Sequence, residues 1–193
     1  MANLYGYIIR MWKRILQKIF HFDKWHISSL DQRKYAQDIL LHCNQRKQEE
    51  YFAEIGCGLG DIIRNIDFHF RVGFDIDKNV LKAVSFLSRI TGQKNIRFAI
   101  FNFPDSPLPD EHDVILMVNW IHHIEPAILK NKLLQYFSEN LREEGEIIID
   151  TVQDPAYRYN HDIRFLTKDL NCSIHCLGQY ARQREVWVIK KLK

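Results

Sequence analysis

The stretch of sequence that decides the fold is Glu54-Ile55-Gly56-Cys57-Gly58-Leu59-Gly60-Asp61. It closes a short apolar run, Tyr51 to Ile55, which predicts a strand. Glycines at alternate positions permit a tight turn and let a ligand approach the main chain without a Cβ in the way. We therefore expect a ligand-binding loop at the carboxyl end of a strand.

Downstream of this loop, strand and helix patterns alternate. Strands are expected at residues 71–74, 96–101, 114–118, 145–152, 172–178 and 185–191, and helices at 80–90, 127–141 and 162–170. Such alternation predicts an α/β fold, a Rossmann-like doubly wound and mostly parallel seven-stranded sheet with helices on both faces. Only the short stretch from Gln179 to Arg184 joins the last two strands, so they are expected to form an antiparallel C-terminal hairpin.

The residues upstream of the loop differ in charge from the rest. Residues 1–48 hold nine Lys/Arg and three Asp, a net +6, whereas the other 18 basic and 21 acidic residues sum to −3. Helices are expected at residues 8–20 and from Asp31, as N-cap, to Cys43. We predict a small N-terminal basic helical cap at 1–48 and a core at 49–193. Three roles stay open for the amphipathic helix at 8–20: a cap over the site, peripheral contact with a membrane, and a homodimer contact.

Composition excludes several classes of protein. With 46% hydrophobic and 26% charged residues, the 193-residue chain is typical of a globular domain. Apolar runs fall well short of the roughly 20 residues of a membrane-spanning helix. The four cysteines are too scattered for a disulfide framework, which favours the cytoplasm. No metal is expected, because strand alternation separates His175 from Cys172 and Cys176.

The spacing of acidic residues indicates the class of ligand. Asp75 ends the next predicted strand, about 20 residues after the loop, where a carboxylate can accept hydrogen bonds from a ribose diol. The dinucleotide pattern G-x-G-x-x-G surrounds a pyrophosphate. In this chain the third glycine comes one residue early, and a carboxylate at Glu54 would repel pyrophosphate. These features suit an adenosine-type cofactor that carries an ammonium and a sulfonium.

At these residues the sequence resembles the class I S-adenosylmethionine-dependent methyltransferases. Their first motif, acidic-x-G-x-G-x-G, is matched from Glu54 to Gly60, and their second by Asp75. Residues 113–124 resemble the substrate-facing end of the family's fourth strand, and 144–149 the entry to its fifth. The resemblance implies S-adenosylmethionine as cofactor. The cofactor-binding residues that it implies are Glu54, Gly56, Cys57, Gly58, Gly60, Asp75, Ile76, Asn102, Phe103 and Asn119.

The resemblance also implies where the adenine and the acceptor bind. Asn102 stands where the family often has an acidic residue that holds the adenine amino group, and its side-chain oxygen can accept the same hydrogen bond. His123 stands where the family often has a histidine near the methyl donor. His122 is a second catalytic candidate, and a reaction without either histidine is the third alternative. The residues expected to contact substrate are Trp120, Tyr157, Tyr159 and His26.

The sequence therefore predicts an S-adenosylmethionine-dependent methyltransferase that acts on a small-molecule or saccharide-precursor acceptor, at oxygen. It lacks the Asn/Asp-Pro-Pro-Tyr signature that marks methylation of planar amino nitrogens in relatives. Two alternatives stay open. One is an RNA methyltransferase, supported only by the +6 segment, so nucleic acid is not the expected partner. The other is a non-catalytic cofactor-binding regulatory subunit.

Overall fold

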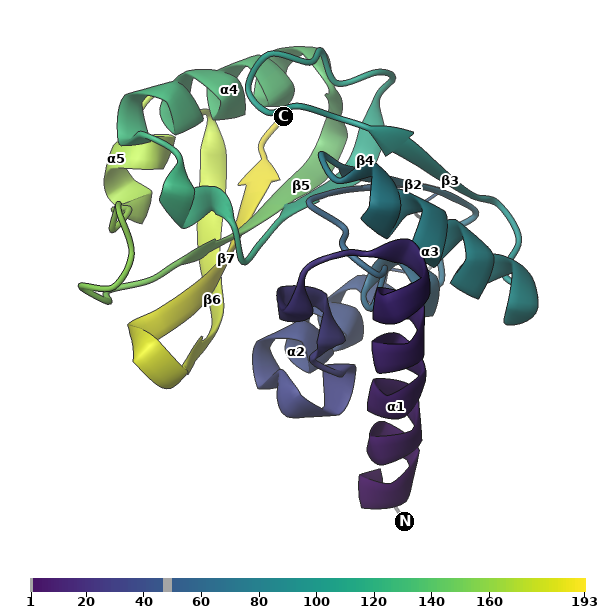
Figure 1. Ribbon diagram of the computed structural model, residues 1–193. Helices are drawn as coiled ribbons and strands as arrows, with labels where there is room; N and C mark the ends of the chain where they lie inside the picture. The colour runs from purple at the N-terminus through teal and green to yellow at the C-terminus, as the bar shows by residue number, and fades with distance from the viewer. Residues whose placement is uncertain (1, 47–49) are drawn as a thin grey trace.

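A computed structural model describes residues 2–46 and 50–193, without the side chains of residues 2–6 and 8. Its centre is one seven-stranded sheet in the order β3-β2-β1-β4-β5-β7-β6 (Figure 1). The strands are β1 (Tyr51–Ile55), β2 (Phe70–Asp75), β3 (Ile96–Ile100), β4 (His112–Met117), β5 (Leu141–Thr151), β6 (Cys172–Tyr180) and β7 (Arg184–Lys191). The first five pair in parallel, and β7 pairs antiparallel with both β5 and β6. The predicted Rossmann-like sheet and its C-terminal hairpin are confirmed.

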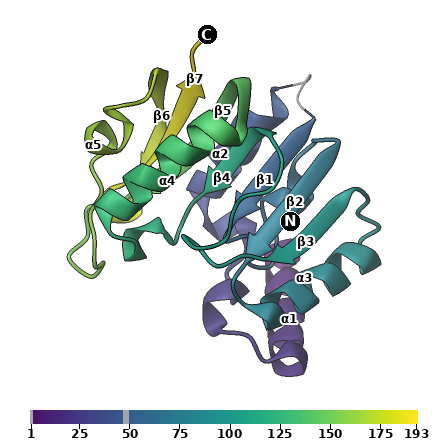
Figure 2. The same cartoon turned by 90° about the horizontal axis from the view of Figure 1, so that it is seen from above.

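Helices cover both faces of this sheet (Figure 2). They are α1 (Ala2–Phe20), α2 (Lys34–Asn44), α3 (Lys78–Ile90), α4 (Pro126–Glu139) and α5 (Ile163–Thr167). Alternate residues of the central strands point to opposite faces. Ile115 and Met117 of β4 therefore pack in one core with α4 and α5, and Val114 and Leu116 in another with α2. This burial on both faces explains the continuous apolar runs in the sequence.

Several predicted boundaries were wrong. Asp31 does not cap α2, because it lies in a 3-10 turn at Leu30–Gln32 and the helix begins at Lys34. The helix predicted to reach residue 141 ends at Glu139, because the side chain of Asn140 donates hydrogen bonds to the carbonyls of Leu108 and Asp110, in the loop between β3 and β4. Leu141 instead begins β5, where it pairs with His112 of β4. The helix predicted at 162–170 is only α5.

The N-terminal segment belongs to the same packed body as the sheet. The buried side of α2, Ala36, Ile39 and Cys43, shares a core with β1 and β4. Leu16 of α1 packs with Leu59 and with residues of α3. The connection from β1 to β2 contains one 3-10 turn, Ile63–Asn65; α2 packs against Ile62, Ile63 and Ile66 of this connection, and Leu16 of α1 packs against Leu59. The predicted boundary between residues 48 and 49 lies outside the described residues.

The strand order reverses beside β1, because the chain goes from β1 to β2 and β3 on one side and later to β4 on the other. In open α/β sheets, ligands bind outside the carboxyl ends of the strands at such a point.

No helix in the described part of the chain is both long enough and apolar enough to cross a membrane.

Candidate active site

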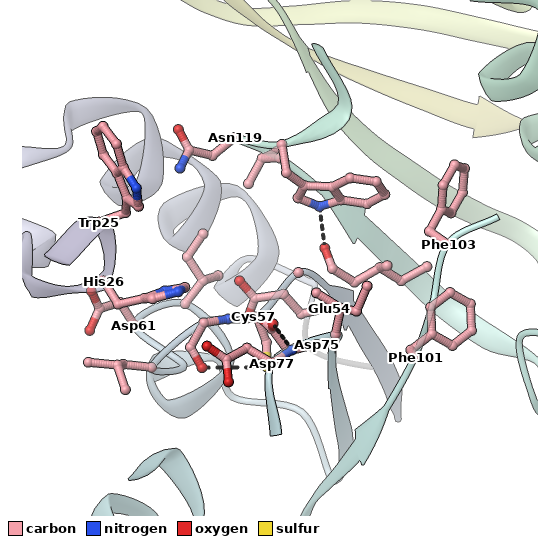
Figure 3. Close-up of a pocket in the computed structure, with 18 of the residues that line it drawn as sticks. Trp25, His26, Glu54, Cys57, Asp61, Asp75, Asp77, Phe101, Phe103 and Asn119 are labelled. Atoms are coloured by element: carbon pink, nitrogen blue, oxygen red, sulfur yellow. Dashed lines mark hydrogen bonds between the residues drawn. The ribbon is translucent and has the colours of Figure 1, made fainter. Parts of the chain in front are cut away.

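A cavity of about 490 Å³ opens at the carboxyl ends of β1, β2 and β4, where the strand order reverses. Its lining comes from Asp23, Trp25, His26, Arg33 and Tyr35, then Glu54 to Leu59, Asp61 and Ile62, then Asp75 to Asp77, Phe101 and Phe103, and last Val118, Asn119, Trp120 and Ile124. Phe101 and Phe103 lie at one end and Trp25 and His26 at the other, with Asp75 between them (Figure 3).

The glycine loop is built so that other groups can approach its main chain closely. Gly56 and Gly58 have φ values of +79° and +53°, which favour glycine. A Cβ on Gly56 would collide with the indole of Trp120, and one on Gly58 would lie 2.9 Å from Nδ1 of His26. The third glycine, Gly60, is not in the cavity lining, because it packs against Val84 of α3.

Asp75 holds the loop and faces the cavity, and its binding of a ribose stays a prediction. Its Oδ2 accepts a hydrogen bond from the Gly58 N–H at 2.9 Å, and its Oδ1 accepts one from the Asp77 N–H at 3.0 Å. Each oxygen keeps a second lone pair for a ligand. The adjacent Ile76 is exposed and lines the cavity. Asp77 caps α3 by accepting from the Asn79 and Val80 N–H groups.

Glu54 is a buried carboxyl in the wall of the cavity. Its Oε2 accepts a hydrogen bond from the Ile63 N–H at 3.0 Å. Burial raises the pKa of Glu54 to about 8, against the opposing effects of that bond and of Arg33. The group is thus largely protonated at neutral pH until a cation arrives, and it fits the ammonium of S-adenosylmethionine. Burial also raises the pKa of the neighbouring Cys57 thiol, which makes Cys57 a poor nucleophile.

The end of the cavity where the sequence predicts the adenine is aromatic. Phe101 and Phe103 line it, and the ring of Trp120 lies 5.0 Å from that of Phe103. Asn102 lies outside the lining, because its side chain donates to Asp105 and its N–H donates to Ser106 within the following turn. A role for Asn102 in adenine binding stays a prediction.

Trp120 and Asn119 follow β4 and line the cavity beside the glycine loop. The indole Nε1 of Trp120 donates a hydrogen bond of 2.6 Å to the Ile55 carbonyl, which fixes the ring over the glycine loop. Asn119 has a φ of +73°, unusual for a residue with a side chain. Its N–H donates to Asp150 at 2.8 Å, and its Oδ1 accepts from Arg184 at 3.2 Å.

Asp150 and Arg184 form a buried ion pair behind Asn119, and sequence reasoning missed both. The Arg184 guanidinium also lies over the ring of Tyr35, 4.9 Å from its centroid. These residues come from β5, β7 and the start of α2, so no local pattern links them. They hold Asn119 in its left-handed conformation and so shape this part of the cavity.

The N-terminal segment forms part of the cavity wall and is tied to the glycine loop by charged side chains. Lys13 of α1 is buried, and its Nζ donates to Asp61 at 2.6 Å and to the Ser28 carbonyl at 2.7 Å. Arg33 pairs with the same carboxylate of Asp61. Burial lowers the pKa of Lys13, although Asp61 acts in the opposite direction. Since Asp61 ends the glycine loop, this cluster joins the cap to the loop.

The short helix Lys24–Ile27 carries two of the lining residues. His26 lies against Gly58, while Trp25 lines the cavity with 77% of its surface exposed. Burial lowers the pKa of His26, against the opposing effect of Asp75 and Asp77. The sequence prediction included His26 and did not include Trp25, Arg33 or Tyr35.

The other predicted acceptor-side residues form a cluster outside the cavity lining. The ring of His122 lies 4.4 Å from His123 and 3.8 Å from Tyr157, and the Tyr159 N–H donates to the His122 carbonyl. Burial, with nearby positive groups, lowers the pKa of His122 to about 4. Catalysis by His122 or His123 and substrate contacts by Tyr157 and Tyr159 stay predictions.

The residues present fit S-adenosylmethionine better than they fit a metal. One cavity contains the glycine loop, which lacks Cβ atoms, the carboxyl of Glu54, the carboxylate of Asp75 and the aromatic end at Phe101 and Phe103. These groups are suited, in that order, to close approach of a ligand, to an ammonium, to a diol and to an adenine. Within residues 2–46 and 50–193, no group of three or more His, Cys, Asp and Glu side chains is placed to hold a metal ion.

Comparisons with known proteins agree with this geometry. The family described as "Methyltransferase domain" matches residues 53–149, which is 97 of the 193 residues. No curated protein matches the chain.

Solved structures with the same fold include methyltransferases crystallised with ligands. The N-methyltransferase NodS from Bradyrhizobium japonicum WM9, in complex with S-adenosyl-L-homocysteine, aligns with a TM-score of 0.71 and 14% identity, over 93% of this chain and 98% of that one. The magnesium protoporphyrin IX methyltransferase ChlM from Synechocystis PCC 6803, with bound SAM, aligns with a TM-score of 0.70 and 11% identity, over 98% and 96%. A putative O-methyltransferase from Nostoc punctiforme PCC 73102 aligns at 0.67 with 16% identity, over 81% and 56%.

The family match, which includes the glycine loop and Asp75, and the order of the seven strands lead to one conclusion. The chain belongs to the class I S-adenosylmethionine-dependent methyltransferases.

Proposed function

We propose that this methyltransferase acts on a small-molecule or saccharide-precursor acceptor and transfers the methyl group to an oxygen atom. The observation that carries the proposal is the capped cavity of about 490 Å³. Pockets of roughly 300 to 1,000 Å³ are typical of small-molecule sites. Cofactor and acceptor share this space under the cap, which favours a compact acceptor over a macromolecule.

Binding of the cofactor is assigned to residues at the glycine loop and at the aromatic end. Glu54 receives the ammonium, Asp75 the ribose hydroxyls, and Phe101 and Phe103 the adenine. When bound, S-adenosylmethionine supplies an electrophilic methyl group on a sulfonium and is converted to S-adenosylhomocysteine. The protein's main contribution is then to hold the acceptor in line, a positioning effect worth roughly 7 to 11 kcal/mol.

The acceptor is assigned to the space between Trp25, Tyr35, Asn119 and Trp120. A hydroxyl acceptor loses its proton as the new carbon–oxygen bond forms. His26 is the one imidazole in the described lining, and its lowered pKa keeps it neutral and able to accept that proton at pH 7. His123 and His122 are the candidates from sequence, and their position outside the lining favours His26.

The test is release of S-adenosylhomocysteine from S-adenosylmethionine in the presence of nucleotide sugars, free saccharides, small phenols, small amines or RNA. The proposal expects turnover with a hydroxyl-bearing small molecule or saccharide precursor. Turnover with an amine would contradict transfer to oxygen. Turnover with RNA that falls steeply with salt would support the RNA alternative. Cofactor binding without turnover in any pool would support a regulatory subunit.

The proton acceptor is tested with His26→Asn and His123→Asn. If His26 acts as proposed, His26→Asn lowers kcat by about 10² to 10⁴ and removes the acidic limb of the pH–rate profile, while the Kd of the cofactor changes much less than kcat. His123→Asn serves as the matched control. The reverse pattern would assign the proton transfer to His123.

A further inference from the structure

We propose that the face formed by α1, α3 and the edge strand β3 docks on the surface of a bilayer that contains anionic lipids. The groove on this face shares no lining residue with the cofactor cavity, and the proposal is independent of the acceptor. Figure 1 shows α1 beside α3, with β3 next to α3 at the edge of the sheet.

The apolar residues of α1 lie on two sides of the helix. Leu16 is 1% exposed and packs inward with Val80 and Ala83 of α3. A second set points outward, with exposed fractions between 40% and 60%: Tyr7, Met11, Trp12, Ile15 and Ile19. In a helix, Met11, Ile15 and Ile19 are spaced by four residues and share one side. The packing of the described residues therefore leaves an apolar stripe uncovered.

The stripe continues onto the neighbouring elements. Phe86 and Ile90 of α3 are 44% and 59% exposed, and Ile100 of β3 is 61% exposed. The ring of Phe20, at the end of α1, lies 6.0 Å from that of Phe86. A shallow groove of about 480 Å³ lies between Phe20, Phe86 and Ile100, with Lys78, Lys82 and Arg89 also in its lining.

This face contains no acidic residue. The 19 residues of α1, the 13 of α3 and the 5 of β3 include no Asp or Glu. With 24 acidic residues in 193, these 37 positions would hold between four and five on average. The same elements carry exposed cations at Arg14, Lys18, Lys78, Lys82 and Arg89.

A face that combines an apolar stripe with cations alone is complementary to an anionic bilayer. Apolar side chains enter the boundary between headgroups and acyl chains, and the cations meet the headgroup phosphates. A symmetric dimer through this face would bring the same cations of two copies together, without acidic partners on the face. Tyr7, Trp12 and Phe86 offer rings on which RNA bases could stack. The exposed aliphatic side chains of the face, Met11, Ile15, Ile19, Ile90 and Ile100, gain nothing from stacking but do gain from entering a bilayer.

The test is sedimentation of the full chain with vesicles of phosphatidylcholine alone and of phosphatidylcholine mixed with phosphatidylglycerol. We expect the protein to bind the mixed vesicles, and we expect this binding to weaken as the salt concentration rises. Binding to the neutral vesicles should be much weaker. Lys18→Ala with Lys82→Ala should lower the partition coefficient about 25-fold, since each cation near the surface contributes roughly fivefold. Ile15→Glu with Ile19→Glu should abolish binding.

The matched control is Ile174→Glu with Leu41→Glu. These residues are 41% and 62% exposed, close to the 40% of Ile15 and the 60% of Ile19, but they lie on β6 and α2. The control should bind mixed vesicles like the unaltered protein. The proposal is overturned if the control loses binding equally, or if the unaltered protein ignores the mixed vesicles. It is also overturned if Ile15 and Ile19 only support a dimer in solution, or if the cations bind RNA but no vesicles.

Discussion

Glu54→Gln is the substitution with the most informative consequence, because it separates the stability of the protein from its affinity for the cofactor. Glu54 is 5% exposed and its pKa is raised to about 8, whereas the unfolded chain titrates near 4.5. Between these values the unfolded state releases a proton that the folded state keeps. The free energy of unfolding therefore falls as pH rises from 4.5 to 8. In Glu54→Gln this decrease is absent, because glutamine does not titrate.

The expected magnitude follows from the difference between the pKa of Glu54 in the unfolded chain and the pH. At roughly 1.4 kcal/mol per pH unit, ionisation of Glu54 in the unfolded chain lowers the free energy of unfolding of the ligand-free protein by about 3 kcal/mol at pH 7. Urea unfolding of both proteins at several pH values measures this quantity as a difference. The stability of Glu54→Gln relative to the unaltered protein should rise by about that amount between pH 4.5 and 7. Glu111→Gln, which alters an exposed carboxyl, should show no such rise.

Affinity should change in the opposite direction. A hydrogen bond between charged groups is worth roughly 1.5 to 3 kcal/mol, so Glu54→Gln should weaken S-adenosylmethionine binding roughly 10- to 150-fold. In the unaltered protein, pairing with the ammonium ionises Glu54, so binding at pH 7 should release close to one proton. Calorimetric titration in two buffers of different ionisation enthalpy measures that proton. A flat stability difference together with no proton release would refute the reasoning, because Glu54 would then already be ionised in the empty cavity.

Three further substitutions test the supports of the cavity. Gly56→Ala places a Cβ against the indole of Trp120 at a positive φ, and should cost about 2 to 4 kcal/mol in urea unfolding and weaken cofactor binding. Arg184→Ala leaves a buried carboxylate without its cation, and should cost about 3 to 5 kcal/mol. Because it also frees Asn119, it should raise the KM of the acceptor more than the Kd of the cofactor; equal changes would contradict the positioning role. Lys13→Met breaks the contact between α1 and the glycine loop and should cost about 1 to 3 kcal/mol, whereas a substitution at an exposed cation of α1 should change the free energy of unfolding by less than about 0.5 kcal/mol.

Local patterns were sufficient to predict the sheet. A buried strand such as β4 leaves a continuous apolar run, and a glycine loop after β1 needs residues that tolerate positive φ. Boundaries were less predictable where a tertiary contact decides them. Leu141 continues a helical pattern in sequence, but pairing with His112 places it in β5. Asp31 has the chemistry of an N-cap, yet α2 begins three residues later.

The part of the cavity lining to which we assign the cofactor was also predictable from local patterns. Glu54, Gly56, Gly58 and Asp75 are spaced along one strand–loop–strand unit, so their sequence distances reflect their distances in space. The part to which we assign the acceptor is assembled from remote segments. Arg184 reaches Asn119 across 65 residues, and only the folded sheet brings β7 beside β5.

The N-terminal helix shows why net charge alone could not assign the role of residues 1–48. The net charge of +6 of this segment includes cations with two different roles. Lys13 and Arg33 are committed to Asp61, where they join the cap to the glycine loop, whereas Arg14 and Lys18 face outward beside the apolar stripe. A helical sequence pattern shows that apolar residues recur every three or four positions. It does not show which apolar side of the helix is buried and which is exposed. Packing does separate them, because α1 buries Leu16 against α3 and leaves the stripe exposed. Substitutions on the inner side should therefore alter the cavity, and those on the outer side should alter only what the protein binds.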